Sequence, residues 1–191
     1  MTKKRIAIFA SGSGSNAEKI AAYFSDATEV EVSLILSNNP QAGVIARARK
    51  FQIPVVLFDK KTFYETNKII QLLQNQHIDL VVLAGFMMLI PEKMVEVFPD
   101  KIVNIHPALL PKYGGKGMYG HFVHEAVVAA QETQSGITIH YVNAHYDEGA
   151  IIFQAICPVL PSDTPEEVAQ KVQVLEHQHY PEVVETLLIK L

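Results

Sequence analysis

Short apolar runs typical of buried strands alternate with helix-like segments along most of this chain. The apolar runs cover residues 4–10, 30–37, 54–58, 79–86 and 101–106. The helix-like segments between them repeat apolar residues every three or four positions, at 16–24, 41–51, 62–76 and 91–98. Strands that alternate with helices are joined by right-handed crossovers, which build a parallel sheet covered on both faces. The sequence therefore predicts an α/β fold of the Rossmann-like, doubly wound type.

The alternation changes in the last third of the chain. Residues 122–132 have helical spacing, and two strand-like runs follow at 136–143 and 150–160. Only a short, turn-rich segment containing YDEG separates these two runs. Strands joined in this way pair antiparallel, so we expect a C-terminal hairpin at one side of a mostly parallel sheet.

A long helical segment, residues 164–191, closes the chain. Thr164 is a favoured N-cap residue and Pro165 suits the first turn of a helix. The chain has 191 residues, and neither a repeat nor a linker interrupts the pattern. We therefore expect residues 1–191 to form a single domain.

Composition and charge exclude several classes of partner. The net charge is -4 and no long basic run occurs, so a nucleic-acid partner is not expected. The apolar run LVVLAGFMMLIP has 12 residues, whereas a membrane span needs about 20. The N-terminal apolar stretch is too short for a signal peptide, and the single Cys157 cannot form an internal disulfide. These features predict a protein of the reducing cytoplasm, away from membranes.

The sequence SGSGSNA follows the first predicted strand and opens the first predicted helix. Gly12, Gly14 and Ala17 match the loose G-x-G-x-x-A pattern of dinucleotide-binding loops. The second strand ends in ILSNNP and lacks the acidic residue that would bind a ribose 2′-hydroxyl. Backbone N–H groups at a helix N-terminus still suit one anion. We therefore expect a lone phosphate here; the alternative is a turn in which Ser15 or Asn16 caps the helix.

Asn104 and His106 lie at the end of the fifth predicted strand. Residues two apart on a strand point to the same side, and ligands collect at the C-terminal ends of parallel strands. Pro107 disfavours a helical conformation at His106. A carboxamide can stabilise an oxyanion and an imidazole can transfer a proton, so the pair predicts attack on a carbonyl group. Asp147 or Glu148 would orient the imidazole, and chemistry alone does not separate them; a purely structural role for His106 is the alternative.

The remaining histidines give no metal-site pattern. His121 with His124 and His177 with His179 could each provide two ligands, but no convincing third ligand accompanies either pair. No metal is expected.

Five segments occur in an order that matches a known family: FASGSGSN, DLVVLAGFM, NIHPALLPKY, GITIHYV with YDEGAII, and VQVLEHQHYP. Together they resemble the phosphoribosylglycinamide formyltransferase family, folate-dependent enzymes of purine synthesis, over essentially the whole chain. NIHPALLP alone is shared with other folate-dependent formyltransferases. The glycine loop and EHQHYP indicate this family.

The resemblance implies a transferase with the formyltransferase fold. It would move a formyl group from 10-formyltetrahydrofolate, its co-substrate, to the amine of N1-(5-phospho-D-ribosyl)glycinamide (GAR). The products would be formyl-GAR and tetrahydrofolate. The enzyme would be a monomer or a homodimer and would need no metal.

The resemblance also implies roles for individual residues. Asn104 would stabilise the oxyanion of the tetrahedral intermediate, and His106 would donate a proton while Asp147 keeps it charged. His140 would line the active site, and Glu176 would lie near the glycinamide end of the substrate. The substrate phosphate would be held by Gly14, Ser15 and Asn16.

The folate site implied by the resemblance has seven members: Lys61, Met87, Met88, Leu89, Ile90, Asn104 and Asn143. Met88 stands where the family often has Arg, and Lys61 where some members use Arg for the glutamate tail of the folate. An apolar wall with free backbone amides suits a flat pterin; the alternative is that residues 87–90 belong only to the core. The glycine-rich loop at residues 114–120 is longer than usual in the family and is either a mobile lid or a rigid surface loop.

Two other functions compete with this interpretation. A methionyl-tRNA formyltransferase would share the catalytic motif but is expected to add a basic C-terminal domain for tRNA. A non-catalytic nucleotide-binding module would keep the glycine loop without needing Asn104, His106 and Asp147 together. The joint presence of those three residues favours the enzyme.

Overall fold

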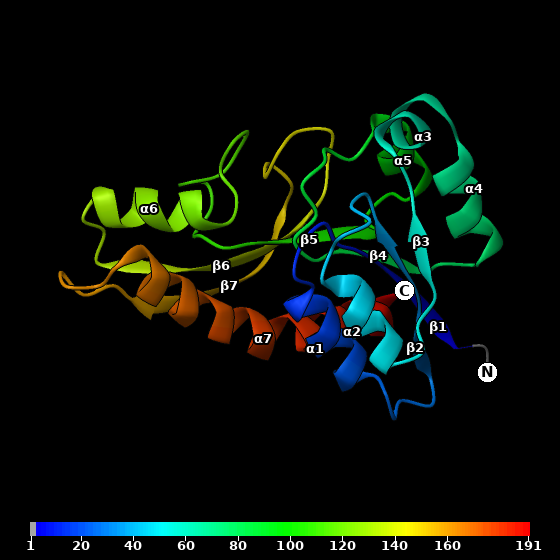
Figure 1. Cartoon of the computed structure of the whole chain (residues 1–191), viewed down its shortest axis with the longest axis horizontal. Coiled ribbons are helices and arrows are strands. Elements are labelled where there is room, and N and C mark those ends of the chain that lie inside the picture. Colours follow the sequence, from blue (N-terminus) through cyan, green and yellow to red (C-terminus); the bar gives the residue numbers. More distant parts are fainter. Residues whose placement is uncertain (1–2) are drawn as a thin grey trace.

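The computed structural model describes residues 3–191, and this part of the chain contains one twisted sheet flanked by helices (Figure 1). The first two residues of the predicted domain, 1–191, lie outside this range. The strands are β1 (Lys4–Phe9), β2 (Val30–Ser37), β3 (Val55–Leu57), β4 (Leu80–Leu83), β5 (Ile102–His106), β6 (Gln134–Tyr141) and β7 (Ile151–Pro158). The helices are α1 (Ser15–Tyr23), α2 (Val44–Lys50), α3 (Lys60–Glu65), α4 (Lys68–Asn75), α5 (Glu92–Val97), α6 (His121–Ala129) and α7 (Pro165–Lys190).

The strand order of the sheet is β3-β2-β1-β4-β5-β6-β7. Strands β1 to β5 pair in parallel, β6 is antiparallel to β5, and β7 is antiparallel to β6. The predicted fold class is confirmed: the sheet is mostly parallel, and its C-terminal pair is an antiparallel hairpin.

Helices cover both faces of the sheet. Successive residues of a central strand point to opposite faces, and an apolar strand therefore needs a covering layer on each face. Ile6 and Ile8 of β1 belong to a core with residues of α1, α2, α6 and α7. Ala7 and Phe9 belong to a second core with residues of α3, α4 and α5. All four β1 residues are 0% exposed. Burial on both faces explains why this strand is continuously apolar rather than alternating.

The single amphipathic helix predicted over residues 62–76 is wrong, because the structure divides this segment into α3 and α4. Thr66 between them is extended. Its hydroxyl donates to the carbonyl of Thr62 at 2.7 Å and accepts from the Lys68 N–H at 3.2 Å. A threonine side chain that bonds to nearby backbone in this way competes with helix propagation.

The closing helix α7 begins as predicted, with Thr164 as its N-cap. The Thr164 hydroxyl accepts from the Glu167 N–H at 3.2 Å, and the Glu167 carboxylate accepts from the Thr164 N–H at 2.8 Å. This capping box satisfies backbone donors that the first turn of a helix leaves free.

Farther along α7, one buried side chain fixes the helix against the sheet. The Tyr180 hydroxyl is 2.9 Å from the carbonyl oxygen of Leu83 and 3.3 Å from that of Val103. Leu83 is the last residue of β4, and Val103 is the second residue of the neighbouring β5. Tyr180 therefore holds α7 directly beneath the edge of the sheet where ligands are expected.

That edge contains the point at which the chain reverses direction across the sheet. β1 lies between β2 and β4, so the segments that leave β1 and β4 pass to opposite sides of the sheet. A crevice forms at the C-terminal ends of strands at such a point.

Candidate active site

A cleft of about 690 Å³ opens at the C-terminal ends of β1, β4 and β5. The loops after β1 and β4, the end of β5, residues 115–121, the β6–β7 loop and α7 all contribute to its walls. This volume suits a small organic ligand or a pair of substrates.

The cleft brings together most of the site residues predicted from the sequence. Those that line it are Gly14, Ser15, Asn16, Met87, Met88, Leu89, Ile90, Asn104, His106, His140, Asp147 and Glu176. Lys61 is exposed on α3 and does not line the cleft. Asn143 does not line it either; its side-chain oxygen accepts from the His145 N–H at 2.9 Å and shapes the β6–β7 loop.

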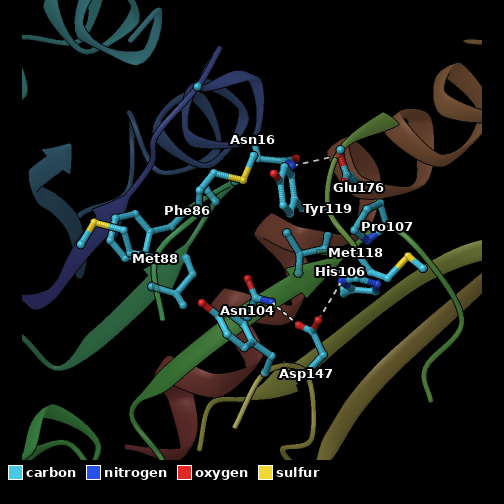
Figure 2. A pocket seen from close by; sticks show the side chains of 18 of the residues that line it. Asn16, Phe86, Met88, Asn104, His106, Pro107, Met118, Tyr119, Asp147 and Glu176 are labelled. Carbon is cyan, nitrogen blue, oxygen red and sulfur yellow. Dashed lines mark hydrogen bonds and ion pairs between the residues drawn. The ribbon is translucent and has the colours of Figure 1, made fainter. Parts of the chain in front are cut away.

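Four polar side chains form a cluster on the floor of the cleft. Asn104 lies directly opposite His140 in the β5–β6 register, and its Nδ2 is 3.1 Å from His140 Nε2. Asp147 approaches from the β6–β7 loop, with Oδ1 3.4 Å from Asn104 Nδ2 and Oδ2 3.5 Å from His106 Nδ1 (Figure 2). The structure thus separates the two candidate carboxylates: Asp147 faces the imidazole, and Glu148 is exposed.

The His106 ring lies between two hydrogen-bond acceptors. Nε2 is 2.7 Å from the carbonyl oxygen of Tyr113, and Nδ1 faces the Asp147 carboxylate. Only the doubly protonated imidazolium can donate to both. Burial opposes this charge and lowers the pKa of His106, while Asp147 and the Tyr113 carbonyl act to raise it. The expectation that Asp147 keeps His106 charged therefore describes one contribution, which burial outweighs.

Asp147 is held in the left-handed backbone region, with φ of 56°. Its Oδ2 accepts from the Gly115 N–H at 3.0 Å. Burial alone would raise the pKa of Asp147, but hydrogen bonding to His140, the charge on His106 and the Gly115 N–H lower it overall. Asp147 is therefore a stable carboxylate between two imidazoles.

Asn104 is expected to stabilise an oxyanion, and its amide hydrogens already have partners. His140 Nδ1 lies 2.8 Å from the Tyr141 carbonyl oxygen, so Nδ1 carries a proton, while the other ring nitrogen, Nε2, lies 3.1 Å from Asn104 Nδ2. One Asn104 hydrogen points to that nitrogen. The other points to Asp147 over 3.4 Å, a long contact. The second hydrogen is the one that an incoming oxygen atom would engage.

The loop after β1 turns its carbonyl groups away from the cleft. The carbonyl oxygens of Ser11, Gly12 and Ser13 accept from Asn39 Nδ2, the Val44 N–H and Arg47 Nε, respectively. Within residues 3–191, no hydrogen bond is formed by the backbone N–H groups of residues 12–17.

Gly14 is the N-cap residue of α1, and no side chain caps the helix. The alternative of a cap by Ser15 or Asn16 is therefore not found. Gly14 has φ of 75° and leaves no space for a side chain, since an added Cβ would lie 2.5 Å from Val44 Cβ. Free N–H groups that converge at a helix N-terminus form an anion-binding site.

Asn16 and Glu176 face each other across the same end of the cleft (Figure 2). Asn16 Nδ2 donates to Glu176 Oε2 at 3.0 Å. Asn16 Oδ1 is buried and has no partner among the described residues, and such an atom normally accepts a hydrogen bond. Burial raises the pKa of Glu176 against the effect of the Asn16 bond. This end of the cleft offers an acceptor to a hydroxyl or amine donor of a ligand.

The loop after β4 forms a largely apolar wall. Phe86 and Met88 lie on the opposite side of the pocket from His106 and Pro107 (Figure 2). Met88 also packs against the second core, and Ile90 is only 2% exposed. Met88 and Ile90 therefore both line the cleft and belong to the core, whereas Met87 lines the cleft and is 48% exposed.

Sequence reasoning missed several contributors to the site. Tyr113 acts through its carbonyl oxygen, which has no signature in the side-chain pattern. His124 of α6 lines the cleft near His106, and burial lowers its pKa. The sequence indicated His124 only as a possible metal ligand, together with His121 three residues before it. Residues 3–191 contain no group of three or more potential metal ligands close enough to hold an ion.

The family model described as Formyl transferase matches residues 4–184. The chain therefore belongs to the formyl transferase family, as its motifs predicted. Among curated relatives, the chloroplastic phosphoribosylglycinamide formyltransferase of Arabidopsis thaliana is 43% identical over 188 residues, which is 95% of this chain and 64% of that protein. The phosphoribosylglycinamide formyltransferase of Bacillus subtilis (strain 168) is 37% identical and covers 97% of this chain and 95% of its own.

Solved structures agree with these relatives. The phosphoribosylglycinamide formyltransferase from Anaplasma phagocytophilum superposes with a TM-score of 0.89 at 36% identity, covering 99% of this chain and 89% of that one. The chain spans less than two thirds of the plant relatives, at 64% for Arabidopsis thaliana and 61% for Vigna unguiculata.

Proposed function

We propose that this protein transfers the formyl group of 10-formyltetrahydrofolate to the amine of GAR, giving formyl-GAR and tetrahydrofolate. The observation that carries the proposal is the placement of Asn104, His106 and Asp147 on the cleft floor, between a free anion site and an apolar wall. Family membership and relatives with this activity in their names support it.

The two ends of the cleft suit the two substrates. The free N–H groups at Gly14, Ser15 and Asn16 would bind the phosphate of GAR. Asn16 Oδ1 and Glu176 would accept hydrogen bonds from the rest of that substrate.

The pterin and formyl group would lie against the loop after β4, with backbone groups of residues 87–90 as polar partners. Lys61 and Asn143 lie outside the cleft, so a role for them would be in binding the part of the folate that extends beyond it. This assignment stays a prediction.

The reaction would begin with attack of the GAR amine on the formyl carbon. The carbonyl oxygen then becomes an oxyanion, which the Asn104 N–H would stabilise; one such donor contributes about 3–4 kcal/mol. The amine gives up a proton through water, which returns a proton to His106, and N10 of the folate gains one as the bond between N10 and the formyl carbon breaks. His106 would donate the proton to the departing nitrogen, and Asp147 stabilises the imidazolium.

The proposal includes one catalytic domain over residues 1–191 and a cytoplasmic enzyme that is a monomer or homodimer. No helix within residues 3–191 is long and apolar enough to cross a membrane. The two plant relatives are named as chloroplastic proteins.

The test is formyl transfer by the purified protein from 10-formyltetrahydrofolate, with GAR and initiator methionyl-tRNA as parallel acceptors. We expect turnover with GAR alone, and a loss of roughly 10²–10⁴-fold in kcat for His106→Ala without loss of folding. Transfer only to tRNA would overturn the acceptor, and no transfer to either would overturn the enzyme assignment. Full activity of the variant would remove His106 from the mechanism.

A further inference from the structure

Ser11 joins three segments that are far apart in the sequence. Its hydroxyl donates to Asn38 Oδ1 at 2.6 Å, at the end of β2. The same oxygen accepts from the Met87 N–H at 3.0 Å, in the loop after β4. Its backbone N–H donates to the Gly85 carbonyl at 3.0 Å, and its carbonyl accepts from Asn39 Nδ2 at 3.2 Å. Ser11 is 9% exposed, so little water competes for these bonds.

The contacts of Ser11 connect the two halves of the cleft. On one side, Ser11 directly precedes the N–H groups of residues 12–16, where the phosphate of GAR is proposed to bind. On the other side, it fixes the backbone at Gly85 and Met87, at the start of the wall proposed for the folate. A shift of either loop changes the geometry of the Ser11 hydrogen bonds. Through these bonds it also changes the position of the other loop.

Asn38 follows the second strand, at a position that binds the ligand in dinucleotide-binding proteins. At the end of the second strand, those proteins place an acidic residue that binds the ribose 2′-hydroxyl. Here the side chains of Asn38 and Asn39 both point back to Ser11. The end of β2 therefore supports the anion-binding loop instead of contacting a nucleoside.

We propose that Ser11 is a positioning residue that couples the phosphate loop to the folate loop. The proposal rests on the proposed function, because it assigns the two ligands to the two loops. When one ligand binds and orders its loop, Ser11 holds the other loop in its binding geometry. Each substrate then binds more tightly in the presence of the other, and the factor is the same in both directions.

The test measures binding of GAR with and without tetrahydrofolate, a pair that cannot react because the folate carries no formyl group. In the wild-type protein we expect each ligand to tighten binding of the other by about 5-fold or more. In Ser11→Ala, the Met87 N–H and Asn38 Oδ1 lose their shared partner. We expect this mutual effect to disappear while the variant still binds each ligand alone.

Three further variants separate coupling from a merely structural role. Ser11→Thr keeps the hydroxyl and is expected to retain coupling. Asn38→Ala removes only the acceptor of the Ser11 hydroxyl, so its effect and that of Ser11→Ala should not add in the double variant. Ser33→Ala is the matched control, because Ser33 also accepts from Arg5 and donates to Glu31, but on β2 outside the cleft. It is expected to leave coupling unchanged.

The outcomes distinguish this proposal from the proposed function. Independent binding of the two ligands to the wild-type protein, or full coupling in Ser11→Ala, would overturn the role of Ser11 and leave the formyltransferase assignment intact. Equal loss of coupling in Ser33→Ala would also overturn it, as a general effect of destabilisation. Failure of the wild-type protein to bind either ligand would overturn the proposed function together with this one.

Discussion

At the scale of single residues, the site depends on a carboxylate shared by two imidazoles. Asp147 lies 3.5 Å from His106 and 3.6 Å from His140, yet the two rings have different hydrogen-bond partners. His140 Nδ1 donates to the Tyr141 carbonyl, and its Nε2 faces the Asn104 carboxamide as well as Asp147. His106 faces two acceptors, the Tyr113 carbonyl and Asp147, so both of its ring nitrogens find a partner when the ring is doubly protonated. This difference supports the proposal that His106, and not His140, is the acid.

Replacing this shared carboxylate should change the pH dependence of catalysis. Asp147 acts to raise the pKa of His106, so Asp147→Asn should lower that pKa further. Because His106 is proposed to act as the acid, the fall in kcat with rising pH should begin at a lower pH in the variant. Profiles of kcat against pH for wild type and Asp147→Asn measure this shift; movement of the limb to higher pH would contradict the assigned role.

Local sequence predicts Asn104 and His106 well, since strand periodicity and a following proline fix where they point. The hydrogen-bonded network of Ser11 with Asn38 could not be predicted, because 27 positions separate its members. The contact of the Tyr113 carbonyl with His106 could not be predicted either, because a backbone atom leaves no pattern in the sequence. Lys61 shows another limit of sequence analysis. Its position in the sequence predicted folate binding, but this position does not indicate whether the side chain reaches the cleft.

At the scale of secondary-structure elements, the important features are the turns that end the strands. Alternation of strand and helix signals was strong enough to predict the sheet and its C-terminal hairpin. The break between α3 and α4 was missed, because the apolar spacing continues across Thr66 and only the bonds of its side chain to the backbone end the first helix. Apolar periodicity indicates which face of a helix is buried, but it does not show that a side chain such as Thr66 hydrogen-bonds to the backbone and ends the helix.

The turn between β1 and α1 allows a direct test. Gly14 has φ of 75°, and an added Cβ would lie 2.5–2.6 Å from atoms of Val44. Gly14→Ala should therefore displace the loop and raise the KM for GAR by about 10-fold or more. A 10-fold increase corresponds to a loss of about 1.4 kcal/mol in binding free energy. The comparison is Gly12→Ala, whose added Cβ would meet no atom within 4 Å. An equal or larger increase in KM for Gly12→Ala would show that the Val44 contact is not the cause.

At the scale of the whole molecule, α7 unites the site with the core. Glu176 on this helix reaches the cleft, and Tyr180 one turn later reaches carbonyls of β4 and β5. The sequence predicted the helix and Glu176 from its cap and from the EHQHYP motif. It gave no indication of the Tyr180 contacts, because the partners are backbone atoms at least 77 positions away.

Removing the Tyr180 hydroxyl should lower the stability of the fold. Tyr180→Phe removes the buried hydrogen bond to the Leu83 carbonyl, and a hydrogen bond of this kind contributes about 0.5–1.5 kcal/mol. Urea denaturation should show the loss as a lower midpoint. Tyr23→Phe is the matched control, since its hydroxyl bonds Glu185 at the surface and Tyr23 is 44% exposed. A smaller effect for Tyr180→Phe than for Tyr23→Phe would contradict this account.

The position of α7 also has a consequence for synthesis of the chain. The ribosome makes this helix after all seven strands of the described sheet, yet α7 packs on β6 and bonds to carbonyls of β4 and β5. A nascent chain that has completed the sheet still exposes the apolar face that α7 will cover. Such exposed surface is prone to aggregation, so we expect the nascent chain to be most prone to aggregate between synthesis of β7 and docking of α7.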